Sequence, residues 1–191
     1  PIYLGIKLHN KFEIVPRDAK TLEVIESEKG YAENIVLDRM YTRLLTFQSF
    51  FDQIVFGSGD GTISASRTTL FNRISNKPAV LESLVRSYPT SVITKRIRLE
   101  TGDHNGVTLT EVGISETTTN INTHAKITDS EGNPIGVPKS IDRIIDIYAT
   151  TYVELYSVDS GLIFYGNGLR DYLTGGAAPS NVMRLFDFTD D

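Results

Sequence analysis

Carboxylates that could act as a pair occur at the start of the last long apolar segment. Asp142 and Asp146 are four residues apart, and in a strand this spacing places two side chains on one face. Two carboxylates on one face are an arrangement that glycoside hydrolases use. Alternating polar positions on a half-exposed strand give the same spacing, so we interpret these residues, with Glu154, as surface positions and predict no catalytic residue.

Histidines raise the question of a metal site. His104 and His124 lie in polar surroundings, without the ligand spacing of a zinc site. Residues 129–134 lack the alternating oxygen ligands and the closing glutamate of a calcium loop. We therefore predict surface histidines, a hairpin turn between Ile127 and Ile135, and neither a metal nor a cofactor.

A glycine-rich run at residues 57–61 reads Gly-Ser-Gly-Asp-Gly and is similar to a phosphate-binding loop. Such a loop requires a Lys-Ser/Thr pair at the start of a helix, whereas Thr62, Ile63 and Ser64 follow here. We interpret the run as a tight turn. No serine lies in a Gly-x-Ser-x-Gly elbow or in the Ser-x-x-Lys motif with its partner motifs, so we predict that the chain is not an enzyme.

Composition narrows the class further. The 191 residues include no cysteine, which excludes disulfides and thiolate metal sites. No apolar run approaches the roughly 20 residues of a membrane span. The net charge of -5 predicts no nucleic-acid partner, although Lys95, Arg96 and Arg98 form a local basic cluster. Residues 1–10 lack a secretory pattern, and Pro1 favours removal of an initiator Met, so we expect synthesis in a cytoplasm.

The elements that would position these side chains begin with two short alternating runs. Residues 11–15 and 21–26 alternate apolar and polar side chains around Pro16, the period of two that is typical of strands. We predict a hairpin there. After Gly30 the apolar spacing changes to between two and four, which predicts the one long helix over residues 33–48.

The rest of the chain has mostly β character. Residues 52–56 are rich in strand formers, whereas residues 81–85 indicate a short helical turn. From Ser91 onward, short β-type runs bounded by Gly, Asn or Asp suit a sandwich. Residues 143–155 form the longest candidate strand, with apolar side chains on both parities, which favours a central strand or one that pairs between subunits.

The sequence thus predicts a mainly β protein with an antiparallel β-sandwich-like domain. The predicted parts are an N-terminal hairpin (1–30), a helix plus β-sandwich domain (31–157) and an extended, aromatic C-terminal arm (158–191). The candidate interface residues are the aromatic side chains of the long strand and the arm: Tyr148, Tyr152, Tyr156, Phe164, Tyr165, Tyr172, Phe186 and Phe188.

Several runs resemble structural proteins of tailed bacteriophages, of the tail-fibre and baseplate type. The first is the opening hairpin at 8–26, followed by Glu-Asn-Ile-Val-Leu-Asp at 33–38. Next comes Ile-Val-Phe-Gly-Ser-Gly at 54–59 with Thr-Thr-Leu at 68–70. The third is Asn-Gly-Val-Thr-Leu-Thr-Glu-Val-Gly-Ile at 105–114, followed by Ala-Lys-Ile at 125–127 and the long strand at 144–155. The resemblance covers residues 8–155 and brings no catalytic residues with it.

The resemblance implies a structural component of a virion, with the tail or baseplate as the preferred location. Its partners would be other virion proteins and further copies of the same chain, and it would be made in the host cytoplasm. One alternative is a receptor- or glycan-binding module that uses exposed tyrosines and the 101–106 loop. The others are a capsid-surface or head-fibre protein and a hydrolase using Asp142, Asp146 or His104.

Overall fold

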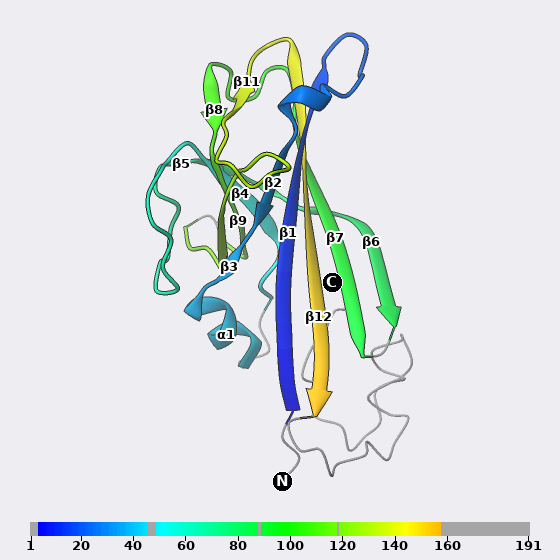
Figure 1. Cartoon of the computed structure of the whole chain (residues 1–191), viewed down its shortest axis with the longest axis vertical. Coiled ribbons are helices and arrows are strands. Elements are labelled where there is room, and N and C mark those ends of the chain that lie inside the picture. The colour runs from blue at the N-terminus through cyan, green and yellow to red at the C-terminus, as the bar shows by residue number, and fades with distance from the viewer. Residues whose placement is uncertain (1–3, 46–48, 88, 118, 158–191) are drawn as a thin grey trace.

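The structure, a computed structural model, describes residues 4–45, 49–87, 89–117 and 119–157. Two five-stranded sheets pack face to face, and all their strand pairs are antiparallel (Figure 1). The strand order is β2-β1-β12-β7-β6 in the first sheet, called the long sheet, and β3-β10-β9-β4-β5 in the second sheet. This architecture confirms the predicted mainly β, antiparallel sandwich-like class.

The long sheet is built around the first and last described strands. Its members are β1 (Leu4–Asp18), β2 (Gly30–Glu33), β6 (Val80–Ser87), β7 (Thr90–Leu99) and β12 (Arg143–Ser157). β1 and β12 pair along their full length, from Leu4 opposite Ser157 to Asp18 opposite Arg143. β12 is therefore the central strand, as its two partly apolar faces predict.

The second sheet is shorter and carries the helix beside it. Its strands are β3 (Ile35–Val36), β4 (Gln53–Gly57), β5 (Arg73–Pro78), β9 (Glu111–Ser115) and β10 (Thr123–Lys126). A separate ladder joins β8 (Val107–Leu109) to β11 (Val137–Lys139), and the helical elements are α1 (Asp38–Leu45) and the short 3₁₀ turn η1 (Glu26–Glu28). In Figure 1 the long sheet extends past the second sheet on the side of α1.

The core lies between the two sheets because each presents one apolar parity to the other. Ile14 and Ile147 from the long sheet share this core with Ile54, Phe56 and Ile114 from the second sheet, and all five are fully buried. Burying each such side chain stabilises the fold by roughly 1.5–3 kcal/mol. The sandwich therefore rests on packing, as a cysteine-free chain requires.

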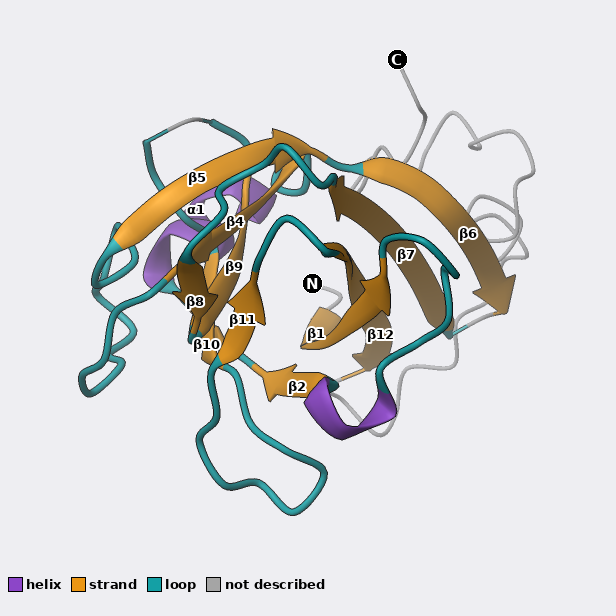
Figure 2. Cartoon of the chain, turned by 90° about the horizontal axis from the view of Figure 1, so that it is seen from above, coloured by secondary structure: helices purple, strands orange, loops and turns teal. Residues whose placement is uncertain are grey.

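Both sides of the sandwich are closed by strands that pass from one sheet into the other. Only Asn34 separates β2 of the long sheet from β3 of the second sheet, and only Ala79 separates β5 from β6. Viewed from above, the chain therefore wraps the core like a flattened barrel (Figure 2). Direct crossings of this kind form the corners of such sandwiches.

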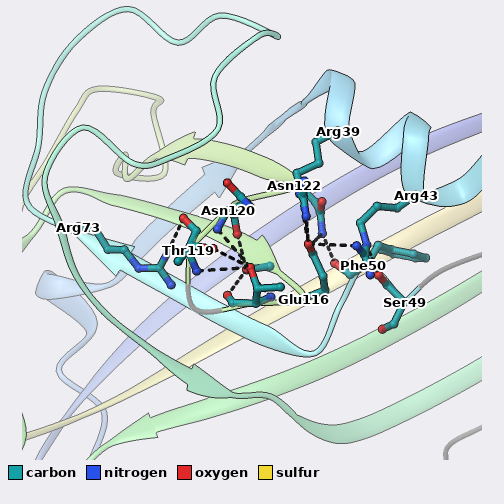
Figure 3. Close-up of polar contacts among 11 residues, drawn as sticks. Arg39, Arg43, Ser49, Phe50, Arg73, Glu116, Thr119, Asn120 and Asn122 are labelled. Carbon is teal, nitrogen blue, oxygen red and sulfur yellow. Dashed lines mark hydrogen bonds and ion pairs between the residues drawn. The ribbon is translucent and has the colours of Figure 1, made fainter.

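A buried carboxylate fastens α1 to this framework. Glu116, just after β9, accepts hydrogen bonds from Arg39 of α1 and from Asn122, whose Nδ2 lies 2.6 Å from Oε2 (Figure 3). Arg43 Nη1 of the same helix lies 3.2 Å from Oε1 of Glu116. Asn122 also donates to the backbone oxygen of Phe50 at 2.7 Å. One acidic side chain thus joins the helix to the turn between β9 and β10.

Two predicted elements near the N-terminus differ from the structure. Residues 11–15 lie within β1, but residues 21–26 form no strand and contribute only an isolated bridge between Arg17 and Val24. The predicted helix starts too early, because residues 30–33 and 35–36 form β2 and β3 and α1 begins at Asp38. Apolar residues at mixed spacings of two and four fit both a helix and a strand. Pairing with distant strands decides that residues 30–33 and 35–36 are strands.

The predicted helical turn at 81–85 is also wrong, since these residues belong to β6. Leu81, Leu84 and Val85 have helix-like spacing, yet they pair with Lys95, Ile93 and Val92 of β7. The C-terminal arm predicted for residues 158–191 lies outside the described residues. Among the described residues, no helix has the length and apolar character needed to cross a membrane.

Candidate interface on the open face of the long sheet

The face of the long sheet that points away from the second sheet, which we call the open face, carries two of the tyrosines that the sequence singles out. Because side chains alternate along a strand, Tyr148 and Tyr152 point away from the core, whereas Ile147 and Val153 are buried in it. His9 of β1 lies opposite Tyr152, and their ring centroids are 5.7 Å apart. An aromatic row therefore runs along the centre of the outward face.

A third tyrosine turns this face into a groove. Tyr31 of β2 lies opposite Glu13 of β1, and the groove between the strands has a volume of about 410 Å³. We call it the tyrosine groove; it is lined by Lys11, Phe12, Glu13, Tyr31, Ala32, Glu33, Thr94, Thr128, Tyr148, Thr150 and Tyr152. Tyr31 and Tyr152 are each 37% exposed, so their rings are accessible to a partner.

The carboxylates that line the tyrosine groove form exposed or long ion pairs. Lys11 Nζ lies 3.3 Å from Glu33 Oε1, and both side chains are more than half exposed. Glu13 Oε1 lies 3.8 Å from Lys29 Nζ, which has a nearer partner in Glu26 at 3.0 Å. An exposed pair such as Lys11–Glu33 contributes about 0–1 kcal/mol because water competes for both partners. These side chains can therefore exchange their present partners for those of a bound molecule at small cost.

A second hollow of about 860 Å³ adjoins the groove. The two share Tyr31, Glu33 and Thr128. We call the second one the loop hollow; it is lined by Tyr31, Glu33, Ile35, Gly61, Thr62, Ile63, Lys126, Thr128, Asp129, Ser130 and Gly132. A concave surface therefore continues from the open face of the long sheet to two loops of the second sheet.

One end of the open face is fixed by a buried aspartate. Asp146 of β12 is fully buried, and Arg98 donates to both of its oxygens, at 2.7 and 2.8 Å. Arg17 and Arg96 each donate at 3.0 Å. Burial raises the pKa of Asp146, but the hydrogen bonds from Arg98, Arg17 and Arg96 outweigh it and hold the pKa below its ordinary value. Asp146 thus ties three neighbouring strands together.

A second buried carboxylate, Glu111 at the start of β9, lies under the glycine-rich loop. Its Oε1 accepts hydrogen bonds from the backbone amides of Gly59 at 2.9 Å and Asn72 at 2.8 Å. Its Oε2 accepts from the amide of Phe71 at 2.9 Å and lies 2.8 Å from Nε2 of His124. The predicted tight turn at 57–61 is wrong, because Gly57 ends β4 and residues 58–61 open a long irregular loop. One amide of the run, that of Gly59, does meet an anion, which is a side chain of the same protein.

This environment keeps the Glu111 carboxyl ionised. Burial raises its pKa, but the hydrogen bonds from His124, Asn72, Phe71 and Gly59 outweigh it, so the pKa lies below the ordinary value. His124 is itself fully buried, and its Nδ1 has no hydrogen-bond partner among the described residues. The Phe71 ring packs on the imidazole with centroids 5.0 Å apart.

The structure separates the residues considered for catalysis. Asp142 precedes β12, is exposed, and accepts a hydrogen bond from Arg143 at 3.2 Å, whereas Asp146 is fully buried. The expectation that both occupy one half-exposed strand face is therefore wrong. The apolar neighbours of Asp146 give no hint that three arginines enclose it, because Arg17 is remote in sequence.

The expectation of surface histidines is wrong for His124, which pairs with Glu111 inside the second sheet. His104 is partly buried with its ring edge-on to Phe56, at a centroid distance of 5.3 Å. The predicted turn at 129–134 is confirmed: Asp129 Oδ1 accepts from the amides of Glu131 and Asn133, both at 2.9 Å. Within the described ranges, no three His, Cys, Asp or Glu side chains are grouped to hold a metal ion.

The side chains of the remaining candidate interface residues lie outside the described part of the chain. Tyr156 lies in β12, but its side chain falls outside the described residues, as do Phe164, Tyr165, Tyr172, Phe186 and Phe188. Sequence reasoning missed Tyr31, although Tyr31 and Glu33 alternate with Gly30 and Ala32, which is the pattern of a short strand.

Chemically, the concave surface offers aromatic rings, hydroxyls and charges of both signs, which suits recognition of a macromolecule. Its aromatic rings are accessible to a partner, and its ion pairs are weak enough for the charged groups of a partner to replace them. Comparison with protein-family models, with curated proteins and with solved structures finds no match.

Proposed function

We propose that this chain is a structural component of a bacteriophage virion, in the tail or baseplate, that acts through protein–protein contacts. The observation that carries the proposal is the open face of the long sheet with its tyrosine groove. A sheet face with accessible Tyr148 and Tyr152 is rich in the residue types that enter the buried centre of protein interfaces. Other virion proteins and further copies of this chain are the expected partners.

The edge strand β6 supports the same proposal, because past the crossing from β5 it pairs with β7 and with no second strand among the described residues. The edge strand β6 exposes Val80 and Val85, which are 62% and 56% accessible. Edge strands with exposed apolar side chains favour association with another chain. Contacts through the groove and through β6 would engage one face and one edge of the same sheet, as a subunit with more than one neighbour requires.

The residues that resemble phage tail proteins also meet in space. β4, which contains Ile-Val-Phe-Gly, pairs with β9, which contains Glu-Val-Gly-Ile. Glu111, in the 105–114 run, accepts hydrogen bonds from the amides of Gly59, which ends the 54–59 run, and of Asn72, which lies just after the 68–70 segment. Short motifs that are far apart in the sequence thus belong to one local structure, and this supports reading them as a unit.

The test is the oligomeric state of the purified chain, measured by size-exclusion chromatography with light scattering and then by electron microscopy. A ring, trimer or other closed assembly is expected. The double variant Tyr148→Ala/Tyr152→Ala should keep the circular dichroism spectrum and lose the assembly, because the substitutions alter only the outward face. Tyr41→Ala is the matched control, since Tyr41 lies on α1 and is 52% exposed.

A folded double variant that still assembles and still enters particles would contradict a role for the groove. A wild-type chain that stays monomeric and does not bind particles assembled without it would contradict the structural role. A chain that assembles on the head instead of the tail would place it as a capsid-surface or head-fibre protein.

A second candidate function is glycan binding, and the tyrosine groove is the observation that favours it. Sugar rings stack on aromatic faces while hydroxyls and carboxylates bind their polar edges. The 101–106 loop takes no part in the groove lining, so loop substitutions should leave such binding unchanged. Saturable binding on a glycan array that is lost in Tyr148→Ala/Tyr152→Ala and kept in Tyr41→Ala would favour this function over assembly.

A further inference from the structure

The chain between β4 and β5 is long and has no strand or helix of its own. Residues 58–72 connect Gly57, the last residue of β4, to Arg73, the first of β5. Ordered connections of this length are uncommon in a compact domain, and their backbone polar groups need partners. Within the loop, Leu70 is buried against Leu37 and Ile121, so one part of it is anchored by packing.

The other anchor is electrostatic. Three backbone amides of the loop, those of Gly59, Phe71 and Asn72, converge on the carboxylate of Glu111 at 2.8–2.9 Å. Successive amides directed at one anion form the concavity that other proteins use to hold phosphates and carboxylates. His124 Nε2 adds a fourth polar contact to the carboxylate, at 2.8 Å from Oε2.

Gly57 at the end of β4 and Gly59 in the loop are both needed for this approach. A Cβ at Gly57 would lie 2.5 Å from Glu111 Oε1, and one at Gly59 would lie 2.6 Å from the same oxygen. Such distances are too short for any larger residue without movement of the loop or of the carboxylate. The glycine-rich run is therefore shaped around an anion, although it has no helix to bind a nucleotide phosphate.

We propose that residues 58–72 form an anion-binding nest whose resident ligand is the protein's own Glu111 carboxylate, and that this internal ligand fixes one wall of the loop hollow. Gly61, Thr62 and Ile63 of the same loop line that hollow. Asp60, also in the loop, forms an ion pair with Lys126, which lines the hollow as well. The nest accepts a small carboxylate. The nest does not depend on the proposed role of the tyrosine groove as an interface.

The experiment removes the resident ligand and supplies a free one. In Glu111→Ala, the amides of Gly59, Phe71 and Asn72 should exchange with deuterium at least about tenfold faster, as the loss of hydrogen bonds to a charged group implies. Sodium formate should restore their protection, because formate fits the space of the missing carboxylate. Formamide, which is similar in size but neutral, and sodium chloride at matched ionic strength should not.

Thr110→Val is the matched control variant. Thr110 Oγ1 also holds the loop, by donating to the backbone oxygen of Gly59 at 2.8 Å, but its loss leaves the carboxylate in place. Faster exchange in this variant should be insensitive to formate, since the nest is already occupied.

If Glu111→Ala folds, two results would overturn the proposal. One is unchanged protection of the three amides in Glu111→Ala, and the other is equal restoration by formate and formamide. If Glu111→Ala does not fold in chloride buffer, its refolding yield is measured in each additive instead. Recovery in formate alone supports the nest, and failure in all additives refutes it.

Discussion

Asp146 and Glu111 are both fully buried carboxylates with lowered pKa values, but they are held in opposite ways. Among the described residues, the Asp146 carboxylate accepts hydrogen bonds only from arginine side chains, including those of Arg17 and Arg98, which are 27% and 38% exposed. Glu111 accepts most of its hydrogen bonds from the backbone of a loop, and its side-chain partner, His124, is fully buried.

The difference shows what each carboxylate controls. When Asp146 is removed, its arginine partners can turn their charged heads to water, and the strands keep their backbone pairing. When Glu111 is removed, the amides of the loop have no alternative acceptor, so the loop path itself changes. The first carboxylate joins strands that are already paired, and the second determines the shape of a segment without regular structure.

The largest expected effect is that of Glu111→Ala on stability. We expect the free energy of unfolding to fall by about 3–5 kcal/mol, because three amides and His124 lose their shared acceptor. Urea denaturation followed by circular dichroism measures the change. A loss of less than about 1 kcal/mol would mean that water replaces the carboxylate without cost.

Asp146→Asn should cost less, about 2–3 kcal/mol, because it leaves partly exposed arginines rather than sealed backbone donors. Glu154→Gln is the control on the same strand, since Glu154 makes only an exposed pair with Lys7 at 3.4 Å. The control should change stability by no more than about 0.5 kcal/mol. If Asp146→Asn were the more damaging variant in the same denaturation assay, the contrast with Glu111 would be wrong.

Gly59→Ala tests the backbone side of the comparison and should cost about 1–3 kcal/mol, the usual range for overpacking. The added Cβ would lie 2.5 Å from the amide nitrogen of Asn72 and 2.6 Å from Glu111 Oε1. Gly102→Ala is the control, because a Cβ there meets nothing within 4 Å. Thermal unfolding of the two variants should separate them clearly, and equal melting temperatures would contradict a tight loop.

The last prediction concerns pH and is one of direction. Since the folded-state pKa of Glu111 lies below the ordinary value of 4.5, its contribution is complete above that value and is lost as pH falls through the folded pKa. The stability difference between wild type and Glu111→Gln should therefore shrink in acid, measured by urea denaturation from neutral to acidic pH. The other ionisable groups around this site are His124, the Asp60–Lys126 pair and Arg67, which stacks on Phe71. A difference that stays constant with pH would show that Glu111 is not ionised in the fold.

The sequence predicts the fold best where one strand carries its own pattern. Residues 143–155 alternate for so many positions that only a strand satisfies both faces, and β12 confirms it. β6 is missed because Leu81 and Leu84 have helical spacing, and a bulge between Leu81 and Ser83 breaks the period of two. The overlong helix at 33–48 fails for a related reason, since β2 and β3 are too short to show a period.

The candidate sites are harder to predict because their parts come from distant residues. Tyr148 and Tyr152 are predicted from the parity of one strand, but Tyr31 joins them only through the pairing of β1 with β2. The sequence gives no sign that Glu111 is buried, because the groups that donate hydrogen bonds to its carboxylate are backbone amides near residues 59 and 72. Backbone amides leave no trace in residue type, apart from the glycines that let them approach.

The full-length pairing of β1 with β12 also determines how the domain responds to mechanical force. Leu4 lies opposite Ser157 at one end of this ladder, and Asp18 lies opposite Arg143 at the other. A pull that separates Leu4 from Ser157 would load the backbone hydrogen bonds one pair at a time, so the strands would peel apart at low force. A pull applied to Leu4 of β1 and to Arg143 of β12, which lie at opposite ends of the ladder, would instead shear the two strands past each other. All the backbone hydrogen bonds would then carry the force together, and the resistance would be far greater.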